Sequence, residues 1–145
     1  MLKFIKNNLT LIFIFLQLSI PLKADFNNSV NTVKKEINRS DIKTAIKLLG
    51  EIKITNENEK ERIDLLFGDI YLKINKPQKA IEFYERAFMT SDEDVESLSE
   101  LGLAESYLRR GNLKESIKHA ERSLEINSDR TRGKIVLAIG LTKNG

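Results

Sequence analysis

Residues 66–88 read LFGDIYLKINKPQKAIEFYERAF, and residues 102–124 read GLAESYLRRGNLKESIKHAERSL. The two segments align without a gap at an offset of 36 residues, with small residues on small ones and large on large. Self-similarity at a fixed period of about 20–50 residues is typical of proteins built from stacked structural repeats. We therefore expect a repeat array.

Each copy reads as two helices joined by a short break. In the first copy, apolar residues recur at helical spacing on both sides of Asn75-Lys76-Pro77. Proline is favoured in the first turn of a helix, so Pro77 is expected to open the second one. In the other copy the break falls at Gly111, which suits the left-handed residue that ends many helices. The chain is thus predicted to be all-α.

Small and aromatic residues recur at fixed places in both copies. The first helix has a large residue, a small one and an aromatic three further on, and the second helix of the first copy follows Ala-x3-aromatic-x2-Ala. This pattern resembles the tetratricopeptide repeat. The resemblance implies close helix pairs at the small residues, with the aromatics filling the space between pairs. The residues that carry it are Phe67, Gly68, Tyr71, Ala80, Tyr84 and Ala87, then Leu103, Ala104, Tyr107, Ser116, Ala120 and Ser123.

The chain departs from the family pattern in three ways. Asp64 and Glu100 stand where the family often has Trp, and Asp92 and Ser128 stand where it often has a closing Pro. The spacing of 36 residues also exceeds the usual value of about 34. None of these changes touches the frame of small and aromatic residues.

Weaker copies flank the two clear ones. Upstream, Ala45, Leu49 and Ile52 lie 35 residues before Ala80, Tyr84 and Ala87, and a first helix is expected from about Phe26. Downstream, a shift of 34 carries Leu103, Ala104 and Tyr107 onto Leu137, Ala138 and Leu141. The last segment is therefore predicted to be the first helix of another repeat, with Ser128 as its N-cap.

The resemblance implies a right-handed α-solenoid. We predict one tetratricopeptide domain over residues 25–145, with repeats at about 26–60, 61–96 and 97–130 and a partial repeat at 131–145.

Residues 1–24 have the layout of a secretory signal peptide. Lys3 and Lys6 precede an apolar run of 14 residues, Leu9 to Leu22, and the small Ala24 is a suitable last residue before cleavage. An uncleaved anchor is the alternative, but a membrane-spanning helix needs about 20 apolar residues. We predict cleavage and export. A composition rich in Ile, Lys and Asn favours a bacterial source, and hence the periplasm or the cell exterior.

The charges of the mature chain balance. The whole chain carries +3, from 24 basic and 21 acidic residues, but three of its lysines lie in residues 1–24, which have no acid. The remainder has 21 of each sign, interspersed along the chain, with no polybasic run. We therefore expect no nucleic-acid partner, and membrane contact only through an uncleaved signal segment.

The residue inventory also disfavours catalysis. The chain has no cysteine, which excludes disulfides, thiolate metal sites and a cysteine nucleophile. His119 is the single histidine, so a histidine metal site or a Ser-His-Asp arrangement would have to be built around it, and we expect it at the surface. We predict no enzyme activity, no cofactor and no metal.

The resemblance also implies that the first helix of each pair lines the concave side of the solenoid. An aliphatic lining with charges of both signs suits an amphipathic helix or an extended segment of another protein. The alternative is that the leucines are ordinary core between repeats and the charges form a solvated face. Asp69 and Glu105 replace the asparagines with which some family members grip a C-terminal carboxylate, so we expect no such clamp. The residues expected on the concave side are Arg62, Leu65, Asp69, Leu72, Lys73, Leu98, Leu101, Glu105, Leu108, Arg109, Arg132, Ile135 and Ile139.

Together these features predict an exported adaptor or scaffold without catalysis of its own, acting in cell-envelope assembly. Two alternatives stay open. In the first, the repeats are the N-terminal part of a longer envelope protein that also has an enzymatic or transmembrane part. In the second, the chain self-assembles through its last helix. In the second case Ile135, Leu137, Ala138 and Leu141 would pair with another subunit.

Overall fold

The structure, a computed structural model, describes residues 25–89 and 92–145. The predicted signal peptide, residues 1–24, lies outside them. The described residues form seven helices and no strand, so the all-α prediction is confirmed. The helices are residues 25–38, α2 (Ile42–Glu51), α3 (Glu57–Lys73), α4 (Pro77–Ala87), α5 (Glu93–Arg109), α6 (Leu113–Ile126) and α7 (Thr131–Asn144).

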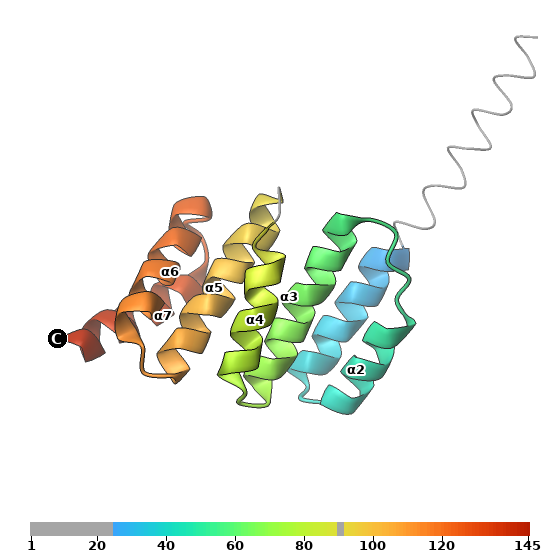
Figure 1. The fold of residues 1–145 in the computed structure, drawn as a ribbon, viewed down its shortest axis with the longest axis horizontal. Helices are drawn as coiled ribbons and strands as arrows, with labels where there is room; N and C mark the ends of the chain where they lie inside the picture. The colour runs from blue at the N-terminus through green and yellow to red at the C-terminus, as the bar shows by residue number, and fades with distance from the viewer. Residues whose placement is uncertain (1–24, 90–91) are drawn as a thin grey trace, which may run out of the picture.

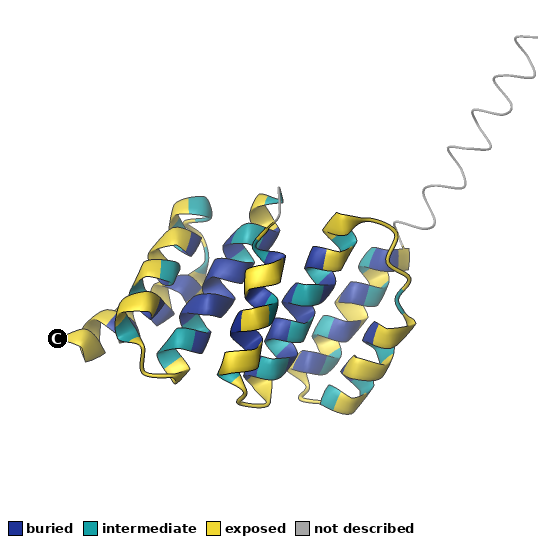
Figure 2. Ribbon diagram, viewed as in Figure 1, coloured by how far each residue is buried: buried dark blue, intermediate teal, exposed yellow. Residues whose placement is uncertain are grey.

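The helices stack as antiparallel pairs in a single row (Figure 1). Residues 25–38 pair with α2, α3 with α4, and α5 with α6, and α7 takes the place of a further first helix. The buried residues lie on the parts of the helices that face neighbouring helices, and the exposed residues lie along the outside of the row (Figure 2). The core is therefore continuous along the stack, as expected of a solenoid.

The turn inside each pair has one residue with a positive φ angle. Ser40 has φ 63°, Asn75 has φ 58° and Gly111 has φ 78°. Gly111 thus has the left-handed conformation predicted for it, and Pro77 is the first residue of α4 as expected. Ser128 is not the N-cap of the last helix, because α7 begins at Thr131. The backbone N–H of Asp129 donates instead to Asn127 Oδ1, in a turn that delays the helix start.

Three buried residues pack at the equivalent place of each interface between successive pairs. Two come from neighbouring first helices and one from the second helix between them. The triplets are Val33, Leu49 and Leu66, then Gly68, Tyr84 and Gly102, then Ala104, Ala120 and Val136. In the middle triplet one large ring lies between two glycines, whereas the first triplet has three aliphatic side chains and the last has two alanines and a valine.

The two acids at the family's Trp positions each pair with a cation on the second helix of the same repeat. Arg86 Nη2 lies 2.9 Å from Asp64 Oδ1, and Arg122 Nε lies 3.1 Å from Glu100 Oε1. Glu100 is 1% exposed and also lies 2.5 Å from His119 Nδ1. His119 stacks on Tyr107 and its side chain is 16% exposed, so it is partly buried rather than fully at the surface. It replaces Phe83, which stacks on Tyr71 one repeat earlier.

The small polar residues of the second copy are buried between α5 and α6. Ser116 Oγ donates to the backbone oxygen of Ala104 at 2.9 Å, and Ser123 Oγ donates to that of Ser97 at 2.8 Å. These small residues let α5 and α6 approach closely, which is the role predicted for them. Ala138 and Leu141 are exposed instead, because no helix among the described residues covers that face of α7.

Tyr84 and its two glycines provide a stability test. A Cβ built on Gly102 would overlap the Tyr84 ring, whereas one built on Gly50, in α2, would meet nothing within 4 Å. We expect Gly102→Ala to lower the free energy of unfolding by about 1–3 kcal/mol. Gly50→Ala is the control, with an expected gain of about 0.5–1 kcal/mol because alanine favours a helix.

Urea unfolding followed by circular dichroism measures both changes. The cost of Gly102→Ala should shrink when Tyr84→Leu is also present, since the smaller side chain leaves room for the new methyl group. An undiminished cost in the double variant would contradict this packing account.

Candidate functional site

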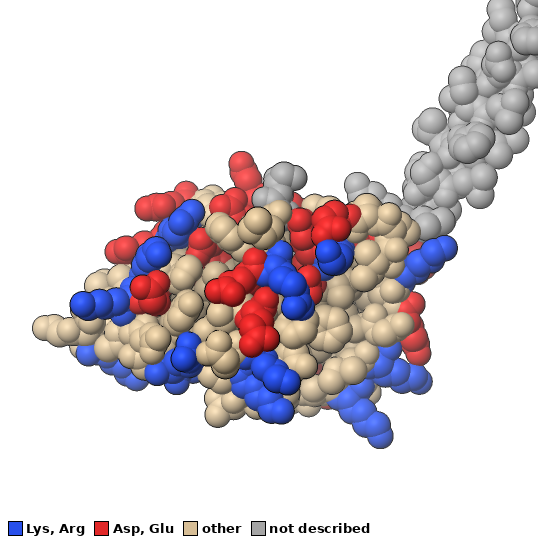
Figure 3. All heavy atoms as spheres, viewed as in Figure 1, with Lys and Arg blue, Asp and Glu red and all other residues tan. Residues whose placement is uncertain are grey.

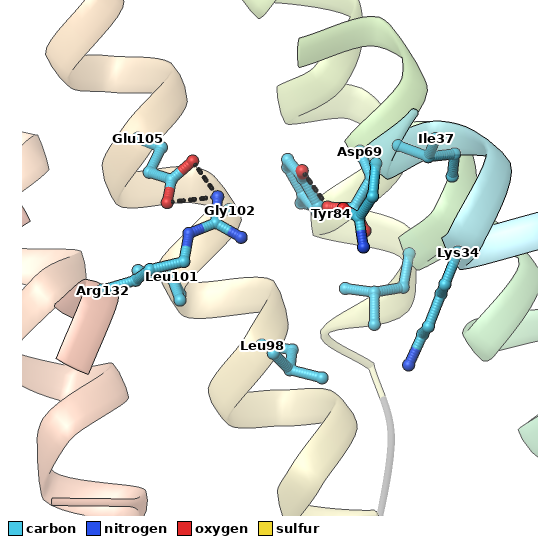
Figure 4. Close-up of a pocket in the computed structure, with 11 residues that line it drawn as sticks. Lys34, Ile37, Asp69, Tyr84, Leu98, Leu101, Gly102, Glu105 and Arg132 are labelled. Carbon is cyan, nitrogen blue, oxygen red and sulfur yellow. Dashed lines mark hydrogen bonds and ion pairs between the residues drawn. The ribbon is translucent and has the colours of Figure 1, made fainter. Parts of the chain in front are cut away.

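A groove runs between the first helices of the four stacked units. Its central cavity has a volume of about 200 Å³ (Figure 4). An adjoining cavity of about 270 Å³ extends it toward the turns and adds Leu72, Lys73 and Arg109. The central cavity is lined by Lys34, Ile37, Asn38, Leu65, Asp69, Tyr84, Leu98, Leu101, Gly102, Glu105 and Arg132.

Tyr84 and Asp69 form the floor of the groove. Tyr84 comes from α4 and passes between Gly68 and Gly102, and its hydroxyl donates to Asp69 Oδ1 at 2.8 Å. Burial raises the pKa of Asp69 above its ordinary value, although the Tyr84 hydrogen bond and the nearby Arg132 oppose the rise. Burial and the Asp69 carboxylate raise the pKa of Tyr84 well above its ordinary value. The floor therefore holds a carboxylate whose charge is costly to keep there.

Two arginines tie the walls together. Arg132 Nη2, from α7, lies 2.6 Å from one carboxylate oxygen of Glu105 and 2.7 Å from the other. Burial lowers the pKa of Arg132, but Glu105 outweighs that effect and raises it. Arg109 Nη1 donates to the backbone oxygen of Leu72 at 2.9 Å and so joins α5 to α3. Glu105 is thus neutralised within the groove, and Arg109 keeps its charge available.

The structure brings nine of the thirteen predicted residues together. These line one cavity or both: Leu65, Asp69, Leu72, Lys73, Leu98, Leu101, Glu105, Arg109 and Arg132. Leu65, Leu72 and Leu101 are also buried core residues, so both interpretations of the leucines apply to them.

Four predicted residues lie elsewhere. Arg62 lines a separate cavity and lies over the Phe26 ring. Leu108 does not line the groove, because it packs against the core cluster that α5 forms with α6 and α7. Ile135 and Ile139 are 52% and 39% exposed on α7, because no further unit among the described residues extends the groove over them.

Sequence reasoning missed five residues that line the groove, namely Lys34, Ile37, Asn38, Tyr84 and Gly102. Lys34, Ile37 and Asn38 lie 35 residues before Asp69, Leu72 and Lys73, the same offset that located the first repeat. Applying that offset to the concave positions would have found them. Tyr84 was assigned only to packing, and only the structure shows its hydroxyl at the groove floor.

The described residues offer little for other chemistry. They contain no group of three or more His, Cys, Asp or Glu side chains placed to hold a metal ion. Within the same residues, each helix is too short or too polar to cross a bilayer.

Comparison with known families identifies the repeat. Residues 65–93, which cover α4 and most of α3, match the family model described as tetratricopeptide repeat. Residues 65–93 therefore form a tetratricopeptide repeat. Tetratricopeptide repeats generally mediate binding to other proteins and are generally not catalytic, so the match supports an adaptor or scaffold role. A search of curated proteins found no match to the chain.

The raised pKa of Asp69 has a consequence for stability. The folded state holds the Asp69 proton more tightly than the unfolded state, so the free energy of unfolding falls as pH rises from the ordinary aspartate value through the raised one. Asp69→Asn removes this charge while its amide oxygen still accepts from Tyr84. We expect the variant to be more stable than the wild type at neutral pH.

Urea unfolding at several values between about pH 4 and pH 8 measures the effect, and the stability of Asp69→Asn should depend less on pH. Asp64→Asn is the matched control: it breaks the Arg86 ion pair outside the groove and should not raise stability. A less stable Asp69→Asn protein at neutral pH would contradict the assignment.

Proposed function

We propose that this tetratricopeptide protein is an exported bacterial adaptor that holds another protein of the cell envelope in its groove and performs no catalysis itself. The observation that carries the proposal is the groove, to which four successive first helices contribute side chains. Its aliphatic walls and charged rim suit a helix or extended segment of a partner.

Export rests on residues 1–24. Their basic start, apolar run and small Ala24 fit a cleaved signal. The neutral balance of the remaining charges fits a protein partner better than a polyanion.

Expression of the full chain in a bacterial host tests export. We expect the periplasmic fraction to contain a protein whose intact mass corresponds to a chain that begins at Asp25. Recovery of the uncleaved chain from the membrane fraction would support the anchor alternative and contradict the proposed processing.

Site-specific photocrosslinking in the source cells tests the groove. A photoreactive residue replaces Leu98, which lines the groove, or Glu82, an exposed residue of α4 outside it. We expect adducts with another protein from position 98 and none from position 82. Equal adducts from both positions, or none from position 98, would count against groove binding.

A further inference from the structure

Charges that alternate along the sequence are separated in the fold. Each turn inside a helix pair lies at one edge of the solenoid, and each connection between pairs lies at the opposite edge (Figure 1). In the space-filling view, cationic side chains follow the lower edge and acidic ones gather toward the upper edge (Figure 3).

The separation is clear when the charges at the two edges are counted by one rule. Each counted segment runs from the last residue of one helix through the third residue of the next helix. The turns, at residues 38–44, 73–79 and 109–115, carry eight cations and two acids, a net +6. The connections, at residues 51–59, 87–95 and 126–133, carry seven acids and three cations, a net −4. We call the first set the basic edge. Its cations are Arg39, Lys43, Lys73, Lys76, Lys79, Arg109, Arg110 and Lys114.

Helix dipoles explain only half of this arrangement. Cations favour the C-terminal end of a helix, as at Lys73 and Arg109. Lys43, Lys79 and Lys114, however, lie in the first turns of α2, α4 and α6, where the dipole favours acids. The cations at these three positions are therefore unfavourable for the helices that carry them.

Few of the cations on the basic edge are in ion pairs. Within the described residues, only Arg39 is in an ion pair, with Glu36. Arg109 donates to the backbone oxygen of Leu72, and Lys79 lies over the Tyr71 ring. Its two acids have other contacts as well: Asp41 caps α2 while also attracting Lys43, and Glu115 lies 3.7 Å from Lys118.

The basic edge and the groove are continuous. Lys73 and Arg109 belong to both, since they line the outer cavity and end α3 and α5. Inside the groove, Glu105 is neutralised by Arg132, and the Asp69 carboxylate is held by Tyr84. A chain that leaves the groove on the turn side therefore meets unpaired cations, and one that stays inside meets leucines. A flat lipid surface matches the edge but not the groove.

We propose that the partner in the groove is a protein segment with an aliphatic anchor and, next to it, a run of aspartate or glutamate residues that crosses the basic edge. The inference rests on the proposed groove function and adds the chemistry and direction of the bound segment. Charge complementarity of this kind raises association rates and selects partners, and it weakens with salt.

Two labelled peptides of equal length test the partner's chemistry. One contains leucines and glutamates, and the other contains leucines and lysines in the same order. Fluorescence anisotropy at low and physiological salt should show that only the glutamate peptide binds the mature protein, with an affinity about tenfold or more weaker at the higher salt.

A charge-reversal variant tests the edge. Lys43→Glu, Lys79→Glu and Lys114→Glu together neutralise the counted segments of the basic edge, leave the residues that line the groove cavities unchanged, and place acids where the helix dipole favours them. The variant should fold and should bind the glutamate peptide about tenfold or more weakly. The matched control, Glu51→Lys with Glu57→Lys and Glu93→Lys at the opposite edge, should bind it no more weakly than the wild type.

Several results would overturn the inference. They are equal binding of both peptides, binding of neither, or an unchanged affinity in the edge variant. Binding to phosphatidylglycerol vesicles in place of the peptide would assign the edge to lipid. A salt-sensitive dimer in sedimentation, lost on reversal of either edge, would assign it to a second copy of this chain.

Photocrosslinking separates this inference from the proposed function. If position 98 gives the same adducts in the wild type and in the edge variant, the groove binds a partner and the basic edge does not help. If it gives none in either, the groove function itself fails.

Discussion

The structure depends on the fit of one tyrosine between two glycines. A side chain at Gly68 or Gly102 would overlap the Tyr84 ring, so the distance between α3 and α5 is set by the thickness of that ring. The same ring carries its hydroxyl to Asp69 and thereby fixes the floor of the groove. The same tyrosine therefore sets both the packing of the helices and the floor of the groove. Other buried residues occupy the equivalent places of the neighbouring interfaces, Val33 with Leu49 and Leu66, and Ala104 with Ala120 and Val136.

The periodicity of the sequence predicted most of the fold, because a repeat offset transfers knowledge from one copy to the next. It located the helix pairs, the opening of α4 at Pro77, the left-handed Gly111 and the buried small residues of α6. The start of α7 was misplaced because Ser128 has the chemistry of an N-cap but lies in a turn that precedes the helix. Ala138 and Leu141 hold the expected places in the repeat frame, but they are exposed because no helix among the described residues covers them.

The candidate site was less predictable, because its interactions join residues that no local pattern relates. Arg132 reaches Glu105 across 27 residues, and Arg109 reaches the backbone of Leu72 across 37. The buried position of Glu100 is equally hidden from the sequence, where an acid at a Trp position reads as a defect. In the fold, Glu100 is held by His119 and Arg122, so the acid keeps the packing role with different chemistry.

Local preferences are broken at two places, one on the floor of the groove and one on the basic edge beside it. Asp69 is a carboxylate kept where burial penalises its charge. Lys43, Lys79 and Lys114 are cations kept where helix dipoles disfavour them. Sequences that otherwise agree with their fold are expected to break local rules where function requires it. Because a solenoid brings every turn to the same edge, a small cost accepted once per repeat adds up to a charged surface, even in a chain with equal numbers of acids and bases.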